Sequence, residues 1–145
     1  MGLKQTGAEI IVKIDNAVAT RLNDDANQSS AVNFNIKVNM NESERSTEQL
    51  VVRYSIVMNT EPVVAKFQVE GSAIVRGRPE DMDEVLSADA QTGAPYLFTK
   101  VYQQVYPVIF MLAGATDIPY PSPGLLQHSK PQAQVAEPVQ QSVNV

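Results

Sequence analysis

The chain has 145 residues, no cysteine, one histidine and a formal net charge of −5 at pH 7. This length fits a single domain whose core can form without metals or disulfides, and the lack of cysteine excludes disulfides and thiolate metal sites. The negative charge argues against nucleic acid as a partner, because affinity for phosphates depends on Lys and Arg.

Residues 8–22 form the first of four stretches that alternate apolar and polar residues. Such alternation predicts a β-strand, because successive side chains of a strand point to opposite faces. The pattern falters at Asn16 and Ala17, where we expect a bulge or a bend. The apolar side of this strand is expected to hold Ile10, Val12, Ile14, Val18 and Leu22.

The second stretch, residues 32–40, is the clearest, since every even position is apolar and every odd one is Asn or Lys. Two further stretches cover about residues 50–58 and 63–76. Gly71 falls inside the last one and indicates a bulge or a close backbone approach. Because short connectors favour hairpins between successive strands, the simplest topology is a four-stranded antiparallel meander.

Two helices are expected after Gly77, which makes the fold class α+β. Pro79 followed by acidic residues is typical of a helix start, because Pro fits the first position and acids favour the positive end of the helix dipole. A second helix is predicted from Pro95 to about Ala113, with Gly114 near its end.

The second helix is apolar over most of its circumference, so it needs cover on two sides. A small sheet covers one side, and we therefore predict a homo-oligomer. The alternative is that the Pro-rich segment 118–126 folds back over the second side. The expected oligomer contacts on the helix are Val101, Tyr102, Val105 and Ile109.

No arrangement of residues typical of catalysis, cofactor binding or metal binding emerges. The single histidine, His128, has no acidic partner nearby in sequence, and no Ser is framed as a nucleophile. The acidic residues after Pro79 fit helix capping better than a calcium loop. The most apolar run, residues 105–113, is too short to span a bilayer. We therefore expect a non-enzymatic cytoplasmic protein without membrane insertion.

Six of the nine aromatic residues lie between positions 96 and 120. Aromatic side chains provide a large contact area at modest entropy cost, so this concentration suits a groove for apolar peptide segments. The alternative is that these residues form the core beneath the sheet and the oligomer contact.

The order of elements resembles the SecB-like family of export and holding chaperones. Three short segments add to the resemblance, namely Gln68–Val75, Pro95-Tyr96-Leu97-Phe98 and Ile118-Pro119-Tyr120-Pro121. The resemblance implies one domain over residues 1–126, and it also implies a long connection after the first strand. From about residue 127 the sequence lacks periodicity, and residues 127–145 are expected to be a disordered tail.

The resemblance also implies an ATP-independent chaperone, assembled as a homotetramer, that holds unfolded client polypeptides in apolar grooves. Ile118, Tyr120, Leu125 and Leu126 would form part of the groove wall by position. A translocation motor or a toxin–antitoxin protein would be the further partner. The alternative function is a structural or adaptor oligomer whose apolar faces are used in subunit contacts.

Overall fold

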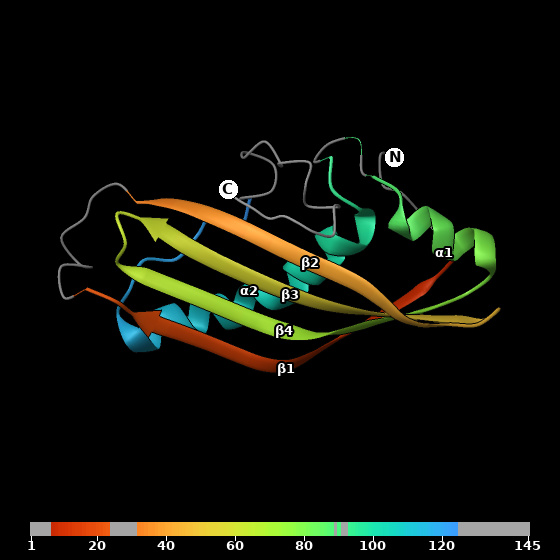
Figure 1. Cartoon of the computed structure of the whole chain (residues 1–145), viewed down its shortest axis with the longest axis horizontal. Helices are drawn as coiled ribbons and strands as arrows, with labels where there is room; N and C mark the ends of the chain where they lie inside the picture. The colour runs from red at the N-terminus through yellow and green to blue at the C-terminus, as the bar shows by residue number, and fades with distance from the viewer. Residues whose placement is uncertain (1–6, 24–31, 89, 91–92, 125–145) are drawn as a thin grey trace.

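The computed structural model describes residues 7–23, 32–88, 90 and 93–124 and has an α+β fold, with four strands followed by a short and a long helix (Figure 1). The predicted fold class is therefore confirmed. The elements are β1 (Glu9–Arg21), β2 (Asn33–Arg45), β3 (Gln49–Glu61), β4 (Ala65–Arg76), α1 (Pro79–Leu86) and α2 (Tyr96–Thr116).

The four strands form one antiparallel sheet in the order β1-β4-β3-β2. Strands β2, β3 and β4 pair in sequence as in a meander, but β1 lies beside β4 and not beside β2. The simple meander is therefore wrong for the first strand. Helix α2 packs mainly against β1, so pairing with β4 brings the apolar side of β1 over this helix and partly buries it.

A register shift between Ile14 and Asn16 marks a bulge in β1, as the faltering pattern predicted. The extra residue moves the following side chains to the opposite face. Ala17 and Ala19 therefore pack against the core, whereas Val18 and Leu22 are 43% and 48% exposed. The prediction that Val18 and Leu22 share the inner face with the residues before the bulge is wrong for this reason.

Tyr54 of β3 reaches across β4 to β1. Its hydroxyl donates a hydrogen bond of 2.8 Å to the backbone carbonyl of Lys13, and Gly71 of β4 is its register partner between the two strands. A Cβ atom on Gly71 would collide with the carbonyl oxygen of Lys13 and would lie 2.6 Å from the hydroxyl oxygen of Tyr54. The close backbone approach predicted at Gly71 is confirmed.

We expect the free energy of unfolding to fall at alkaline pH because of Tyr54. Burial, and then the Asp15 carboxylate, raises the pKa of Tyr54 from 10.0 to about 12. The folded form thus holds this proton more tightly, so the stabilisation is complete below pH 10 and is lost between about pH 10 and 12. Urea titrations should show a loss of about 1 kcal/mol from this group between pH 9 and 11. Tyr54→Phe should show a smaller fall than the parent protein, and an equal fall would contradict this origin.

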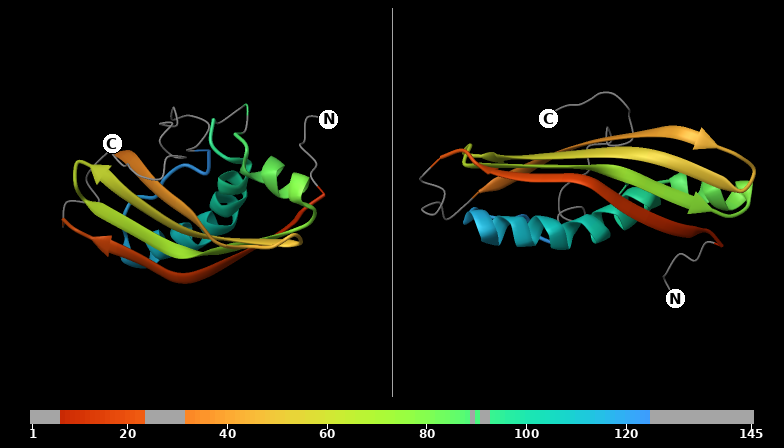
Figure 2. Two further views of the ribbon diagram at one scale, coloured as in Figure 1. Left: turned by 45° about the vertical axis from the view of Figure 1, so that its right-hand side comes forward. Right: turned by 90° about the horizontal axis from the view of Figure 1, so that it is seen from below.

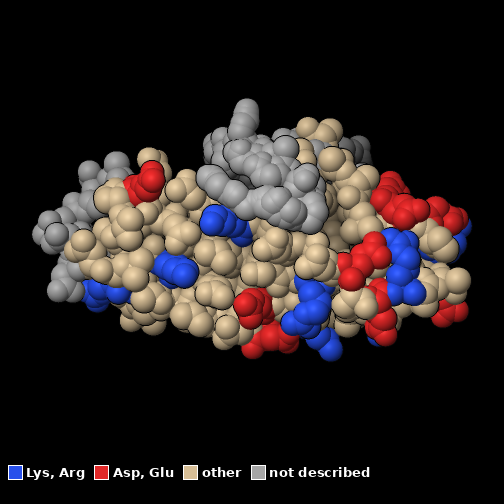
Figure 3. All heavy atoms as spheres, in the orientation of Figure 1, with Lys and Arg blue, Asp and Glu red and all other residues tan. Residues whose placement is uncertain are grey.

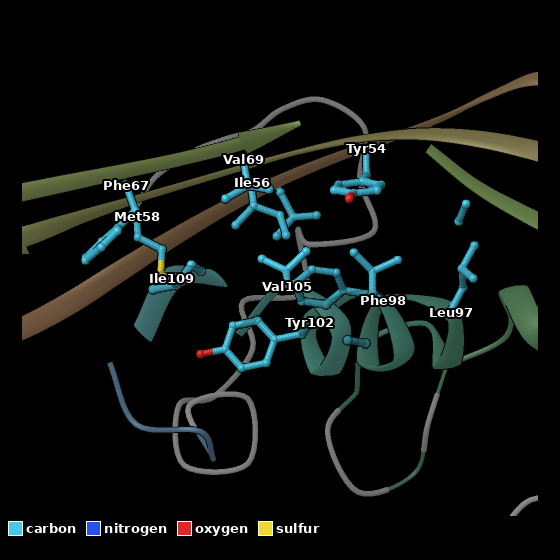
Figure 4. Packing of buried hydrophobic residues seen from close by; sticks show 14 of the residues in the cluster. Tyr54, Ile56, Met58, Phe67, Val69, Leu97, Phe98, Tyr102, Val105 and Ile109 are labelled. Carbon is cyan, nitrogen blue, oxygen red and sulfur yellow. The ribbon is translucent and has the colours of Figure 1, made fainter. Parts of the chain in front are cut away.

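Helix α2 forms the second layer and lies against one face of the sheet (Figure 2). Side chains from β3 and β4 meet side chains of α2 in a single core (Figure 4). The largest fully buried side chains are Phe67, Phe98, Leu50, Ile56, Met58, Met82, Leu97, Ile109, Val52, Val69, Val75 and Val85.

Charged side chains of both signs gather at the end of the molecule that carries α1 (Figure 3). Arg45 at the end of β2 lies 3.5 Å from the Asp83 carboxylate of α1. Asp81 accepts hydrogen bonds of 3.3 Å from the backbone N–H and from Nε of Arg78. The Arg78 side chain is the main cause that lowers the pKa of Asp81. The predicted helix start at Pro79 is confirmed.

Candidate functional site

Four aromatic residues of α2, each four positions after the last, form an aromatic stripe along the helix. They are Phe98, Tyr102, Tyr106 and Phe110, and successive ring centroids lie 6.2, 5.9 and 6.3 Å apart. Residues four apart face the same side of a helix. The stripe begins in the core, where Phe98 is fully buried, and ends at the surface, where Phe110 is 47% exposed.

The chain turns back after α2 and follows this stripe. Asp117 adopts a left-handed conformation with φ of 59°, and the amide of Ile118 donates a hydrogen bond to the carbonyl of Ala113. This conformation ends the helix at Thr116, beyond the predicted end near Gly114. Residues 118–124, which we call the return segment, then pass behind β3 and β2 on the helix side of the sheet (Figures 1 and 2).

Two tyrosines of the stripe bind the return segment. Tyr106 donates a hydrogen bond of 2.8 Å to the carbonyl of Pro121, and Tyr102 donates one of 3.1 Å to the carbonyl of Ser122. The ring of Tyr120 packs edge-on against Phe110 with centroids 4.7 Å apart. For residues 118–124, this confirms the alternative in which the Pro-rich segment folds back to cover the helix.

Burial extends the protonated state of both hydrogen-bonding tyrosines to more alkaline pH. Burial raises the pKa of Tyr102, with a further contribution from Tyr106. The pKa of Tyr106 is raised by burial and then by Tyr120. Because both phenols stay neutral at physiological pH, both remain hydrogen-bond donors to the return segment.

We expect the double variant Tyr102→Phe, Tyr106→Phe to loosen the return segment while the sheet stays folded. Each lost hydrogen bond should lower the free energy of unfolding by about 0.5–1.5 kcal/mol. Hydrogen exchange measured by mass spectrometry should become faster over residues 118–124. Exchange in β3 serves as the internal control. Unchanged exchange in the return segment would show that other contacts hold it.

The inner face of β2 borders the same region and is incompletely covered. Phe34, Ile36 and Met40 are only partly buried, whereas Met58 and Tyr54, which pair with Ile36 and Met40 on β3, are 0% and 3% exposed. Helix α2 packs against β1 and β4, so the edge strand β2 extends beyond it. The aromatic stripe, the return segment and this face of β2 together form our candidate functional site.

The residues predicted as a groove wall differ in where the structure places them. Ile118 is 6% exposed and belongs to the core, so it offers little surface to a ligand. Tyr120 is 51% exposed and lies at the end of the stripe. Leu125 and Leu126 lie outside the described residues, as does the tail predicted at 127–145.

The four predicted oligomer contacts lie in the core of the single chain. Val101, Tyr102, Val105 and Ile109 are 0–2% exposed. As placed here, Val105 and Ile109 point toward the sheet (Figure 4), so these side chains have almost no surface for a second copy. The exposed large apolar residues on this part of α2 are Phe110, at 47%, and Met111, at 68%.

The partial exposure of β2 was not predicted from the sequence, because perfect alternation indicates one buried face but not how far a helix covers it. The spacing of 98, 102, 106 and 110 is the signal that could have located the stripe. Among the described residues, no group of three or more His, Cys, Asp and Glu could hold a metal ion. Neither described helix is long and apolar enough to cross a membrane.

The sequence matched no protein-family model and no curated protein. Among solved structures, the fold is similar to the Mycobacterium tuberculosis SecB-like chaperone Rv1957, determined in complex with a ChAD peptide from the Rv1956 HigA1 antitoxin. The TM-score is 0.57 at 12% sequence identity, and the match covers 79% of this chain and 86% of that chain. The likeness shows that this chain has a SecB-like fold, as the order of elements predicted.

Proposed function

We propose that this protein is an ATP-independent holding chaperone that binds non-native polypeptide segments in the cytoplasm. The observation that carries this proposal is the half-exposed pair of Phe110 and Tyr120 at the surface end of the aromatic stripe. Large exposed aromatic side chains in contact with each other are typical of binding surfaces, because burying them gains area at low entropy cost.

The partly covered face of β2 supports the same function. Phe34, Ile36 and Met40 add an aliphatic and aromatic strip beside the stripe, and residues 33–41 of β2 carry one charged side chain, Lys37. An apolar surface with few charges binds segments that a folded protein would bury. It does so without a defined sequence, as a holding chaperone requires.

The partner of the SecB-like neighbour supports a peptide client. That chaperone is bound to a peptide of an antitoxin, and the same kind of partner is our first choice for this protein. A translocation motor of protein export is the alternative partner. In either pathway, antitoxin binding or protein export, the client segment would be unfolded when this protein binds it.

We infer in addition that the protein works as a homo-oligomer, with a tetramer as the expected size. Met111 is 68% exposed on α2 and lies four positions from Pro107, which is also exposed. Burying such residues against a second copy would reduce the apolar surface left to water. Closed symmetric assemblies are the usual result of such contacts.

The test is the mass of the purified protein by light scattering, alone and with a permanently unfolded polypeptide. A tetramer that gains the mass of the polypeptide, and that slows the aggregation of several unrelated clients without ATP, would support the proposal. A stable oligomer that ignores every client would favour the structural or adaptor alternative. A monomer that still binds clients would remove only the inference about assembly.

A further inference from the structure

Strand β2 is an edge of the sheet with an open side. In the described part of the chain it pairs with β3 alone. Alternate backbone N–H and C=O groups along its other side therefore have no strand partner there. An edge of this kind is a template for another extended chain.

The two edges of the sheet differ in how well they are protected. Strand β1 is interrupted by its bulge and carries Glu9, Lys13 and Asp15. Residues 33–41 of β2 have no bulge, no Pro and Lys37 as the single charge, since the register shift comes later, between Glu42 and Glu44. Bulges, prolines and charges are the features that discourage strand addition. The open stretch of β2 lacks them except for Lys37.

The side chains of β2 define what a strand beside it would need. Phe34, Ile36, Val38 and Met40 face the helix side, and Asn33, Asn35, Lys37, Asn39 and Asn41 face the solvent side. A neighbouring strand places its own side chains in line with these rows. The matching segment therefore has apolar residues at every second position and uncharged polar residues between them.

The charge of Lys37 favours such a segment over a second copy of the chain. Symmetric antiparallel pairing over residues 33–41 is centred on residue 37, so it would set Lys37 directly opposite Lys37 of the other copy. Like charges directly opposite destabilise a strand pair, whereas an acidic residue opposite Lys37 stabilises it. The edge therefore favours a different chain with a neutral or acidic residue at the centre.

We propose that the open edge of β2, residues 33–41, binds an extended client segment by strand addition, with alternating apolar side chains toward Phe34, Ile36 and Met40 and an acidic residue opposite Lys37. This inference rests on the proposed chaperone function and gives it a mode of binding. Main-chain hydrogen bonds supply affinity in this mode, and the alternating side chains supply preference.

The test uses a fluorescent nine-residue peptide that alternates threonine and valine and carries glutamate at its central position. A second peptide carries lysine there. The full-length protein should bind the glutamate peptide about two- to five-fold more tightly than the lysine peptide, and Lys37→Glu should reverse this preference. Lys13→Glu, the same change in charge on the other edge strand, is the matched control and should leave the preference unchanged.

The proposal would be overturned if Lys37→Glu did not reverse the preference for the glutamate peptide. It would also be overturned if Lys13→Glu reversed that preference to the same extent. Failure of the parent protein to bind either peptide would overturn it as well. If unfolded clients are still held in those cases, strand addition fails while the chaperone function stands. Tighter peptide binding after removal of residues 127–145 would instead assign the edge to the chain's own tail. A halved mass on peptide binding would assign it to a subunit contact.

Discussion

Replacing Gly71 with alanine is expected to lower the free energy of unfolding by about 3 kcal/mol or more, or to prevent folding. The new methyl group would meet the backbone carbonyl of Lys13 and the hydroxyl of Tyr54, both held by the sheet. A backbone atom in a paired strand cannot move aside as the end of a flexible side chain can. Losses of this size in the free energy of unfolding usually come from steric conflict in the core or from a broken network of buried hydrogen bonds.

Urea denaturation followed by circular dichroism measures this effect, and Gly114→Ala is the matched control. A Cβ atom on Gly114 has no heavy atom within 4 Å, and its position lies inside α2. Alanine should therefore raise the free energy of unfolding there by about 0.5–1 kcal/mol. A small effect at Gly71, comparable in size to that at Gly114, would mean that β1 and β4 separate more easily than the structure shows.

The largest functional effect is expected from the double variant Phe110→Ser, Tyr120→Ser. Both side chains are about half exposed, so the variant should fold with a modest loss of stability. Removing two aromatic contacts from a binding surface should cost about 2 kcal/mol or more of client affinity, which is roughly 30-fold. We expect the protein to lose its ability to suppress client aggregation at near-stoichiometric amounts.

Val63→Ser is the control for this experiment, because Val63 is a large apolar residue that is 62% exposed but lies in the turn between β3 and β4. This variant should suppress aggregation as well as the parent protein. Thermal unfolding and circular dichroism should show that all variants are folded. Full activity of the double variant would show that clients bind at a surface other than the aromatic stripe.

The alternation of residues was enough to predict β2 and β3, because one face of β3 is buried along its whole length and one face of β2 is buried or partly buried from Phe34 to Met40. It failed in β1 after residue 14. A single bulge there inverts the faces, and sequence alone gives only a weak pause at Asn16. The pairing of β1 with β4 could not be predicted from the alternation either, since an apolar face does not specify which edge of a sheet the strand joins.

The site was predicted in part. The cluster of aromatics between positions 96 and 120 indicated the region, and Tyr120 lies at its surface. Which aromatics stay exposed depends on the return segment. Its course is set by hydrogen bonds from Tyr102 and Tyr106 to backbone carbonyls of Ser122 and Pro121. Every residue has a backbone carbonyl, so no sequence pattern predicts these contacts.

The strand order has a consequence for how the chain is made. Strand β1 leaves the ribosome first, yet its partner β4 is the last strand to be synthesised. During that interval the amphipathic strand β1 has no native neighbour to pair with. Pairings between strands distant in sequence also form slowly. The nascent protein is for that time itself an unfolded chain with alternating apolar residues, of the kind that we propose the finished protein binds.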